Sequence, residues 1–348
     1  MSFKSDLTGI IRLEFKRYGI ECNADKMEVD ELAARYCEML KRHIAPVRRT
    51  VHLSNEIHGS LEKLTQTSAS ELLDTALEAR DATFELRRLL SNGNDVTRFL
   101  SKRIKDAPET QRVHDKLLWD YGMYHFHLSK DTDSTGFVRR SDYLLFAIVT
   151  QDHVYFVDVR PHHDPKGLQW VHQDLLTIVH SNWPELISPH VMRGVQGTVL
   201  TDEQKKELRR KNVNHVPELG NQAVAPLGWG STMAGSSMRC MYWAHKLLHE
   251  IRRHQSYFDA QPSDLLSALE SIGVDTTAGA HFELVLLSDL DLVDSVKAHL
   301  RADHCYSKDL CNMGFAVVER TTRLPIVSTI VYVDAEGFSP SSTRTCKN

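Results

Sequence analysis

The stretch WDYGMYHFHLSKDTDSTGFVRRSDYLLFAIVTQDHVYFVDVRPHH, residues 119–163, holds the clearest strand pattern in the chain. Its three apolar runs predict three consecutive antiparallel strands, at Tyr121–Ser129, Ser141–Thr150 and His153–Arg160. The link Thr150-Gln151-Asp152 is short and polar, as a hairpin requires, and the longer link Lys130–Gly136 is rich in loop-forming residues. A small antiparallel sheet is therefore expected in the middle of the chain.

Alternation along the first strand assigns its side chains to two faces. Tyr124, Phe126 and Leu128 share one face, which we expect to pack on a core. His125 and His127 share the other face, so their imidazoles should lie side by side on a polar surface of the sheet. The second strand is apolar on both faces, which is typical of a strand inside a sheet.

The chain before this meander is predicted to be helical. Apolar residues recur at helical spacing in Met27–Ile44, and Ser54 and Ser70 are suitable N-caps for two further helices. Another helix is expected from Asp95 to Ile104. The role of this region is open between a structural support, a docking site for a protein partner or inhibitor, and an autoinhibitory arm.

After the meander, helices alternate with strands. We expect helices at Leu168–Val179, at Met238–Tyr257 and at Leu290–Leu300, and Thr201 with Gln204 forms a capping-box pattern before a charged helix. The fold class is therefore α+β, with a helical N-terminal region, a central antiparallel sheet and a mixed α/β C-terminal region. The expected boundaries are 1–108, 109–191 for the sheet domain, 192–338 for the C-terminal domain and 339–348 for a flexible tail.

Composition limits the class of protein. The formal net charge of −4 over 348 residues argues against a protein that coats nucleic acid through overall positive charge. No apolar run is long enough for a membrane-spanning helix, and the N-terminus lacks the apolar core of a secretory signal. The six cysteines form no Cys-x-x-Cys pair, so neither a zinc ribbon nor a disulfide framework is indicated. We expect a cytoplasmic protein without a cofactor and without membrane contact.

The residues best suited to proton chemistry gather around the meander. The candidate catalytic residues are His125, His127, Arg139, Arg140 and His163, and Arg160 and His162 lie beside them in the sequence. A neutral imidazole can take a proton and a second one can return it, while a guanidinium can hold a phosphate oxygen. We assign His125 or His127 as base, the other of the two or His163 as acid, and Arg139 or Arg140 as the phosphate-binding residue. These groups suffice for metal-independent RNA cleavage, in which the ribose 2′-hydroxyl attacks the adjacent phosphate.

A basic stretch precedes the meander. The candidates for contacting a nucleic-acid backbone are Arg98, Lys102, Arg103, Lys105 and, after the meander, Arg160. A solvated helix face is the alternative explanation of the same charges.

A Gly/Ser/Thr-rich loop also leads into the helix expected at Met238, where backbone N–H groups can bind an anion. Its candidate residues are Gly230, Ser231, Thr232, Gly235 and Ser236. The alternative is a plain connecting loop, because neither phosphate-loop spacing is present.

At the level of architecture, residues Asp115–Trp183 resemble the RelE-type and barnase-type endoribonuclease toxins. The resemblance rests on a strand with YHFHL, an Arg-led strand RRSDYLLFAIV, a hairpin at TQD and a strand HVYFVDV followed by His and Arg. It implies RNA as substrate, with His and Arg on one face of a small sheet, and a toxin or phage-defence role. The same stretch is also similar to uncharacterised bacterial and prophage proteins.

Two other functions stay open at this point. The basic surface and the helical region could belong to a non-catalytic module that binds nucleic acid or a protein. Alternatively, His125 and His127 with one of His162, His163 or Asp164 could hold zinc in a metal-dependent hydrolase. Arginines nearby oppose a cation, and both histidines could also be solvated residues of a sheet surface.

Overall fold

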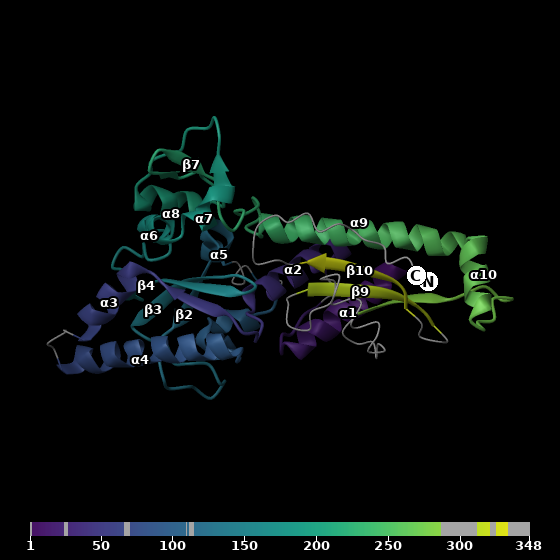
Figure 1. Ribbon diagram of the computed structural model, residues 1–348, viewed down its shortest axis with the longest axis horizontal. Coiled ribbons are helices and arrows are strands. Elements are labelled where there is room, and N and C mark those ends of the chain that lie inside the picture. Colours follow the sequence, from purple (N-terminus) through teal and green to yellow (C-terminus); the bar gives the residue numbers. More distant parts are fainter. Residues whose placement is uncertain are drawn as a thin grey trace.

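The computed structural model describes residues 2–23, 27–65, 70–108, 110, 115–286, 312–320 and 325–332. The molecule is elongated (Figure 1), with the meander and its helices at one end and a long helix, α9 (Met238–Ala260), running along the other. The α+β class expected from the sequence is confirmed. None of the helices in the described ranges is both long and apolar enough to span a bilayer.

The predicted meander forms a sheet of four strands. Its members, in spatial order, are β1 (Thr50–Leu53), β4 (His153–Pro161), β3 (Tyr143–Val149) and β2 (Met123–His127). The three predicted strands pair antiparallel, with β3 inside the sheet as expected. The added strand β1 pairs with β4 in parallel. The first strand starts later than predicted, because Tyr121 ends helix α5 (Lys116–Tyr121) and Gly122 takes a left-handed φ of 66°.

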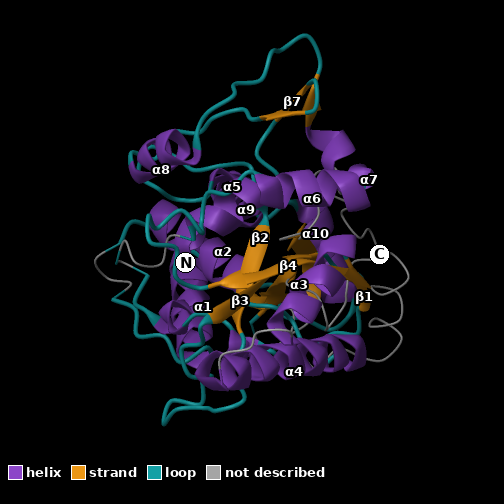
Figure 2. Cartoon of the chain, turned by 90° about the vertical axis from the view of Figure 1, so that its left-hand side faces the viewer, coloured by secondary structure: helices purple, strands orange, loops and turns teal. Residues whose placement is uncertain are grey.

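Both faces of this sheet are covered by apolar residues. Helices α3 (Asn55–Thr65) and α4 (Ser70–Asn92) lie beneath one face, where Phe126 and Phe156 are fully buried. Helix α6 (Asp174–Asn182) covers the other face, where Phe146 is fully buried (Figure 2). His125 and His127 lie on a polar part of that face, as expected, but the chain after β4 folds back over it, so both residues are half-buried and line a cavity.

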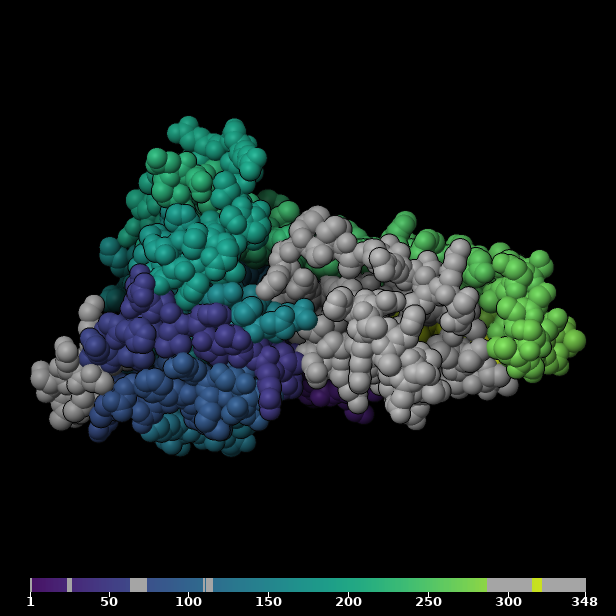
Figure 3. Space-filling view, in the orientation of Figure 1, coloured from purple at the N-terminus to yellow at the C-terminus, as the bar shows by residue number. Residues whose placement is uncertain are grey.

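A small layer follows the meander. It contains α7 (Pro184–Ile187), a 3₁₀ turn η5 (Ser188–His190), α8 (Asp202–Arg210) and a three-stranded sheet of β5 (Val191–Met192), β7 (Gln222–Val224) and β6 (Glu218–Leu219). The predicted capping box at the start of α8 is confirmed in both directions. In the space-filling view, this segment lies directly above α3 and α4 as part of one packed lobe (Figure 3).

The second lobe is built from both ends of the chain. Helices α1 (Phe3–Arg17), α2 (Val29–Arg42), α9 and α10 (Ser263–Ser271) share a core with a sheet of β8 (Phe282–Leu286), β9 (Asn312–Glu319) and β10 (Pro325–Tyr332). Residues 1–108 thus divide between two cores, since α3 and α4 pack on the meander. The helix expected at Leu290–Leu300 and the tail 339–348 lie outside the described residues.

Two predicted helices differ from the observed structure near the site. The one expected at Asp95–Ile104 is instead two 3₁₀ turns, η2 (Thr97–Phe99) and η3 (Lys102–Lys105). The one expected to begin at Leu168 begins at Asp174 as α6, so the residues before it are free to form a loop. Both departures place irregular backbone next to the His-bearing strand.

Candidate functional site

A cavity of about 670 Å³ lies over the His-bearing side of β2. Its polar and aromatic lining is Arg42, Ser101, Lys102, Arg103, Asp115, Lys116, His125, His127, Arg140, His162, Gln169, Trp170 and Arg209. Among these residues Asp115 is the single carboxylate, against several guanidinium and ammonium groups. Positive charge collected in a concave site creates a potential that attracts anions. The cavity is therefore suited to an anionic ligand.

Three imidazoles meet in this cavity. The alternation of β2 places His125 beside His127, with ring centroids 5.9 Å apart, so the predicted shared face is confirmed. His162 follows β4, and its ring lies 5.5 Å from that of His127. Trp170 packs edge-on against His125 at 4.8 Å. Two sheet strands and one loop thus bring these rings together.

The three imidazoles are held in their neutral form. Burial, together with the neighbouring His125, His162 and Arg140, lowers the pKa of His127 to about 3. Burial, followed by Arg140, lowers the pKa of His162 to about 4. Burial also lowers the pKa of His125. The Nδ1 atoms of His125 and His127 are buried and have no hydrogen-bond partner among the described residues, so both rings retain unused capacity for a ligand.

The remaining candidate catalytic residues lie in different environments. Arg140 lines the cavity, with its Nη2 atom 3.5 Å from Nδ1 of His162. Arg139 is exposed and outside the lining. His163 is also exposed, with its ring centroid 4.8 Å from that of His162. The buried His162, and not His163 as expected, therefore lies in the cavity beside His127.

The candidate nucleic-acid-binding residues divide into two groups. Lys102 and Arg103 line the cavity, although Lys102 also pairs with Asp133. The others have partners away from it: Arg98 pairs with Glu85 at 2.6 Å, and Lys105 donates to the carbonyl oxygen of Tyr18.

Arg160 is held by carboxylates on both sides. It donates to Asp158 at 2.8 Å and to Asp174 at 2.9 Å. This guanidinium links β4 to the first turn of α6 and does not line the cavity.

The sequence did not indicate three other lining residues. Arg42 ends α2 and is only 5% exposed. Arg209 comes from α8 and donates from Nε to Asp120 at 2.6 Å. Gln169 comes from the loop before α6. Each of the three reaches the cavity through tertiary packing, so no local pattern could have identified it.

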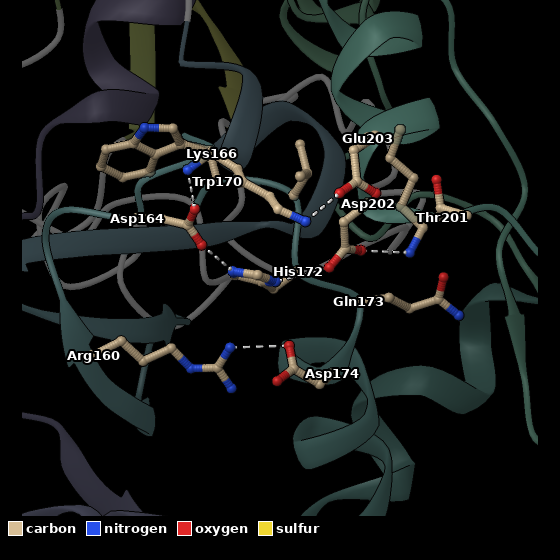
Figure 4. A network of polar contacts seen from close by, with 12 residues as sticks. Arg160, Asp164, Lys166, Trp170, His172, Gln173, Asp174, Thr201, Asp202 and Glu203 are labelled. Atoms are coloured by element: carbon tan, nitrogen blue, oxygen red, sulfur yellow. Dashed lines mark hydrogen bonds and ion pairs between the residues drawn. The ribbon is translucent and has the colours of Figure 1, made fainter. Parts of the chain in front are cut away.

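The loop that carries Gln169 and Trp170 is fixed by one histidine (Figure 4). His172 lies between Asp202, at 2.8 Å from Nδ1, and Asp164, at 3.3 Å from Nε2. Asp164 lies near the beginning of this loop and His172 near its end, while Asp202 is the first residue of α8. The His172 ring therefore joins the two ends of the loop to each other and to α8. The cover of the cavity is thereby anchored to the rest of the lobe.

The loop before α9 does not behave as an anion site. The backbone N–H groups of its candidate residues donate to acceptors within the chain: Gly230 to Trp119, Ser231 to Asn214, Thr232 to Ser236, and both Gly235 and Ser236 to Thr232. At the helix end itself, the buried carboxylate of Glu38 accepts from the N–H of Ser237 at 2.7 Å. A carboxylate of the chain thus occupies the place that a bound anion would take.

Although three imidazoles meet in the cavity, neither they nor any other three His, Cys, Asp or Glu side chains in the described ranges are arranged so that they could hold a metal ion. Comparison with known proteins gives no match, whether to a family model, a curated protein or a solved structure.

Proposed function

We propose that the cavity binds the backbone of RNA and cleaves it without a metal ion. The observation that carries this proposal is the meeting of His125, His127 and His162 with Arg140 and other cations in one cavity. Imidazoles supply proton transfer, and guanidinium groups supply stabilisation of the charge that develops on a phosphorane-like transition state. The resemblance to endoribonuclease toxins agrees with this choice of substrate.

The reaction assigns one task to each group. His127 accepts the proton of the ribose 2′-hydroxyl while its oxygen forms a bond to phosphorus. The bond from phosphorus to the 5′-oxygen breaks, and His125 or His162, once protonated, gives a proton to that leaving oxygen. Arg140 holds the non-bridging oxygens. The products are a 2′,3′-cyclic phosphate and a free 5′-hydroxyl.

Binding of the substrate would prepare the imidazoles for this work. With pKa values of about 3 and about 4, His127 and His162 are weak bases in the empty cavity. A phosphate anion within hydrogen-bonding distance favours the protonated form and raises both pKa values toward neutrality. Proton exchange then becomes efficient when the substrate is in place.

The test is cleavage of a single-stranded RNA oligonucleotide in EDTA. Wild-type protein is expected to release 2′,3′-cyclic ends, and His127→Gln to be at least about 100-fold slower. His58→Gln is the matched control, since His58 is exposed on α3. An oligonucleotide with 2′-deoxyribose throughout should stay intact. Cleavage by His127→Gln at the wild-type rate would overturn the proposal.

A toxin or phage-defence role follows if the activity is present in cells. Expression of wild type and of a His125→Ala/His127→Ala variant, with growth and total RNA integrity followed together, tests that role. Growth arrest with fragmented RNA is expected for the wild type alone.

The second candidate is RNA binding without catalysis. The lowered pKa values favour it, because at neutral pH they leave His127 and His162 without a proton to donate. RNA binding by wild-type protein with no cleavage product would select this function over the first.

A further inference from the structure

The lining of the cavity is arranged in two groups along β2. His127 lies near Arg140 and Lys102, whose charges act on its pKa. His125 lies near Asp115 and Arg103, whose charges act on its own pKa. Two residues along a strand advance by about 6.5 to 7 Å. The cavity therefore has one end at His127 and another beyond His125.

The second end is formed by Arg42, Lys116 and Arg209 from three different helices. Burial lowers the pKa of Arg42, and the carboxylates of Glu38 and then of Asp115 act against that shift; Asp115 is the N-cap of α5, next to Lys116. The ammonium group of Lys116 donates to the carbonyl oxygen of Arg209 at 2.8 Å. These contacts link Lys116 to the backbone of Arg209 and place Arg42 on the Asp115 side of the cavity.

Polar atoms at this second end are buried without partners. Nε of Arg42, Nη2 of Arg209 and Oε1 of Gln169 accept or donate no hydrogen bond to any residue that the structure describes. The guanidinium of Arg42 is buried as well, and its Nη1 atom donates to the carbonyl oxygen of Arg103 at 3.1 Å, while no carboxylate of the described residues accepts a hydrogen bond from it. A buried, unpaired donor is costly, and a charged one more so. An anionic ligand would satisfy the two guanidinium donors, whereas Oε1 of Gln169 is an acceptor and needs a donor group of the ligand.

We propose that the Arg42–Arg209 end is a second phosphate subsite. It holds the phosphate next to the one that reacts at His127, because both ends line one cavity and the second end lies beyond His125, an advance along β2 of about 6.5 to 7 Å or more. The substrate would then be a strand with at least two consecutive phosphates. This assignment rests on the proposed function for the identity of the first end.

The test compares two ligands that the proposed reaction cannot cleave. Calorimetry would measure the affinity of uridine 3′-monophosphate and of uridine 3′,5′-bisphosphate. The wild type is expected to bind the bisphosphate at least tenfold more tightly. Arg42→Gln should remove most of that preference and leave the affinity for the monophosphate within about twofold. Arg140→Gln should weaken the binding of both ligands by a similar factor.

Equal affinities in the wild type would overturn the subsite, and so would an unchanged preference in folded Arg42→Gln. If Arg42→Gln fails to fold by circular dichroism, Lys116→Gln decides, since Lys116 is half-buried and belongs to the same end of the cavity. It should reduce the preference at least threefold, and no reduction would overturn the subsite. If the wild type prefers the bisphosphate but does not cleave RNA, the proposed cleavage reaction is rejected and the second subsite is retained. If the wild type cleaves RNA but binds the two ligands equally, the second subsite is rejected and the proposed cleavage reaction is retained.

Discussion

The rings of His127 and His162 lie 5.5 Å apart, although one stands on edge strand β2 and the other follows β4, with β3 between them. The contact arises because the N–H of His162 donates to the carbonyl oxygen of Asp142 at 2.6 Å, just beyond the paired ends of β3 and β4. Each imidazole then disfavours a proton on the other. The cavity therefore contains interacting bases, not independent ones.

The stability of the protein is expected to fall in mild acid. His127 and His162 have pKa values of about 3 and about 4 in the fold, below the value of about 6.5 in an unfolded chain. The unfolded state therefore binds more protons as the pH falls from about 6.5 toward 4. Each histidine contributes a loss of up to about 1.4 kcal/mol per pH unit.

Urea unfolding at pH 7, 5.5 and 4.5 measures this dependence. His127→Gln should give a shallower decline than wild type, while His43, whose pKa burial also lowers to about 4, contributes equally to both. Parallel curves for the two proteins would contradict the assignment.

Binding of RNA is expected to depend steeply on salt, and Arg140 should account for part of the slope. Removal of one cation that touches a phosphate of a single strand reduces the slope of log K against log salt by about 0.7. Arg140→Gln should show that reduction with unchanged stability, because Arg140 is exposed and pairs with no carboxylate in the described structure. Fluorescence titrations from about 50 to about 300 mM salt, a range over which such binding weakens strongly, measure it. Arg139→Gln, outside the cavity, is the matched control and should keep the wild-type slope.

Arg160 should matter for stability and not for RNA. Its side chain is 17% exposed and donates to two carboxylates, so Arg160→Gln leaves Asp158 buried without its cation. We expect the free energy of unfolding to fall by about 1 to 3 kcal/mol. The affinity for RNA should stay within about twofold of wild type. A large loss of affinity in a folded variant would return Arg160 to the binding surface.

His172 should control the loop over the cavity. His172→Phe keeps a ring but removes both contacts to Asp164 and Asp202, which should cost about 1 to 2 kcal/mol. Hydrogen exchange across residues 162–173 should become faster, and RNA cleavage slower. Lys166→Gln is the control, because it breaks only the exposed pair with Glu203, worth about 0.5 kcal/mol or less. Equal exchange rates in both variants would show that the bridge does not hold the loop.

Gly228 should tolerate no side chain. A Cβ atom there would lie 2.1 Å from the carbonyl oxygen of Leu118 and 2.3 Å from that of Trp119. Both are backbone atoms of α5, so Gly228→Ala should lower the free energy of unfolding by about 2 kcal/mol or more. Gly9→Ala, in α1 with open space around it, should instead stabilise by about 0.5 to 1 kcal/mol. Thermal unfolding of the two variants measures the contrast.

The sequence predicted the meander because alternation is a local property of each strand. It also predicted the shared face of His125 and His127 for the same reason. It could not predict β1, because this strand has four residues and pairs in parallel with β4, which lies about 100 residues later in the chain. It could not predict the cover of the histidines either, because that depends on where α6 turns back.

The sequence predicts His163 as a site residue, but His162 lines the cavity instead, because the strand alternation does not extend to these two positions. Beyond Pro161, at the end of β4, alternation no longer determines which side chain points to the sheet face. The sequence predicts the helix that contains Arg42. The position of Arg42 in the cavity, however, depends on how α2 packs against η3, where Arg42 donates to the carbonyl oxygen of Arg103. A single sequence contains no local pattern that predicts such a tertiary contact.

Helix α2 packs in the core of one lobe and ends at a residue that lines the cavity of the other. A shortened chain that kept the meander alone would retain three imidazoles and lack the guanidinium that closes the far end. A ligand bound across both ends would act as a cross-brace between the lobes. Its presence should therefore resist any hinge motion between them, and mutations that loosen the packing between the lobes should weaken binding without touching the ligand.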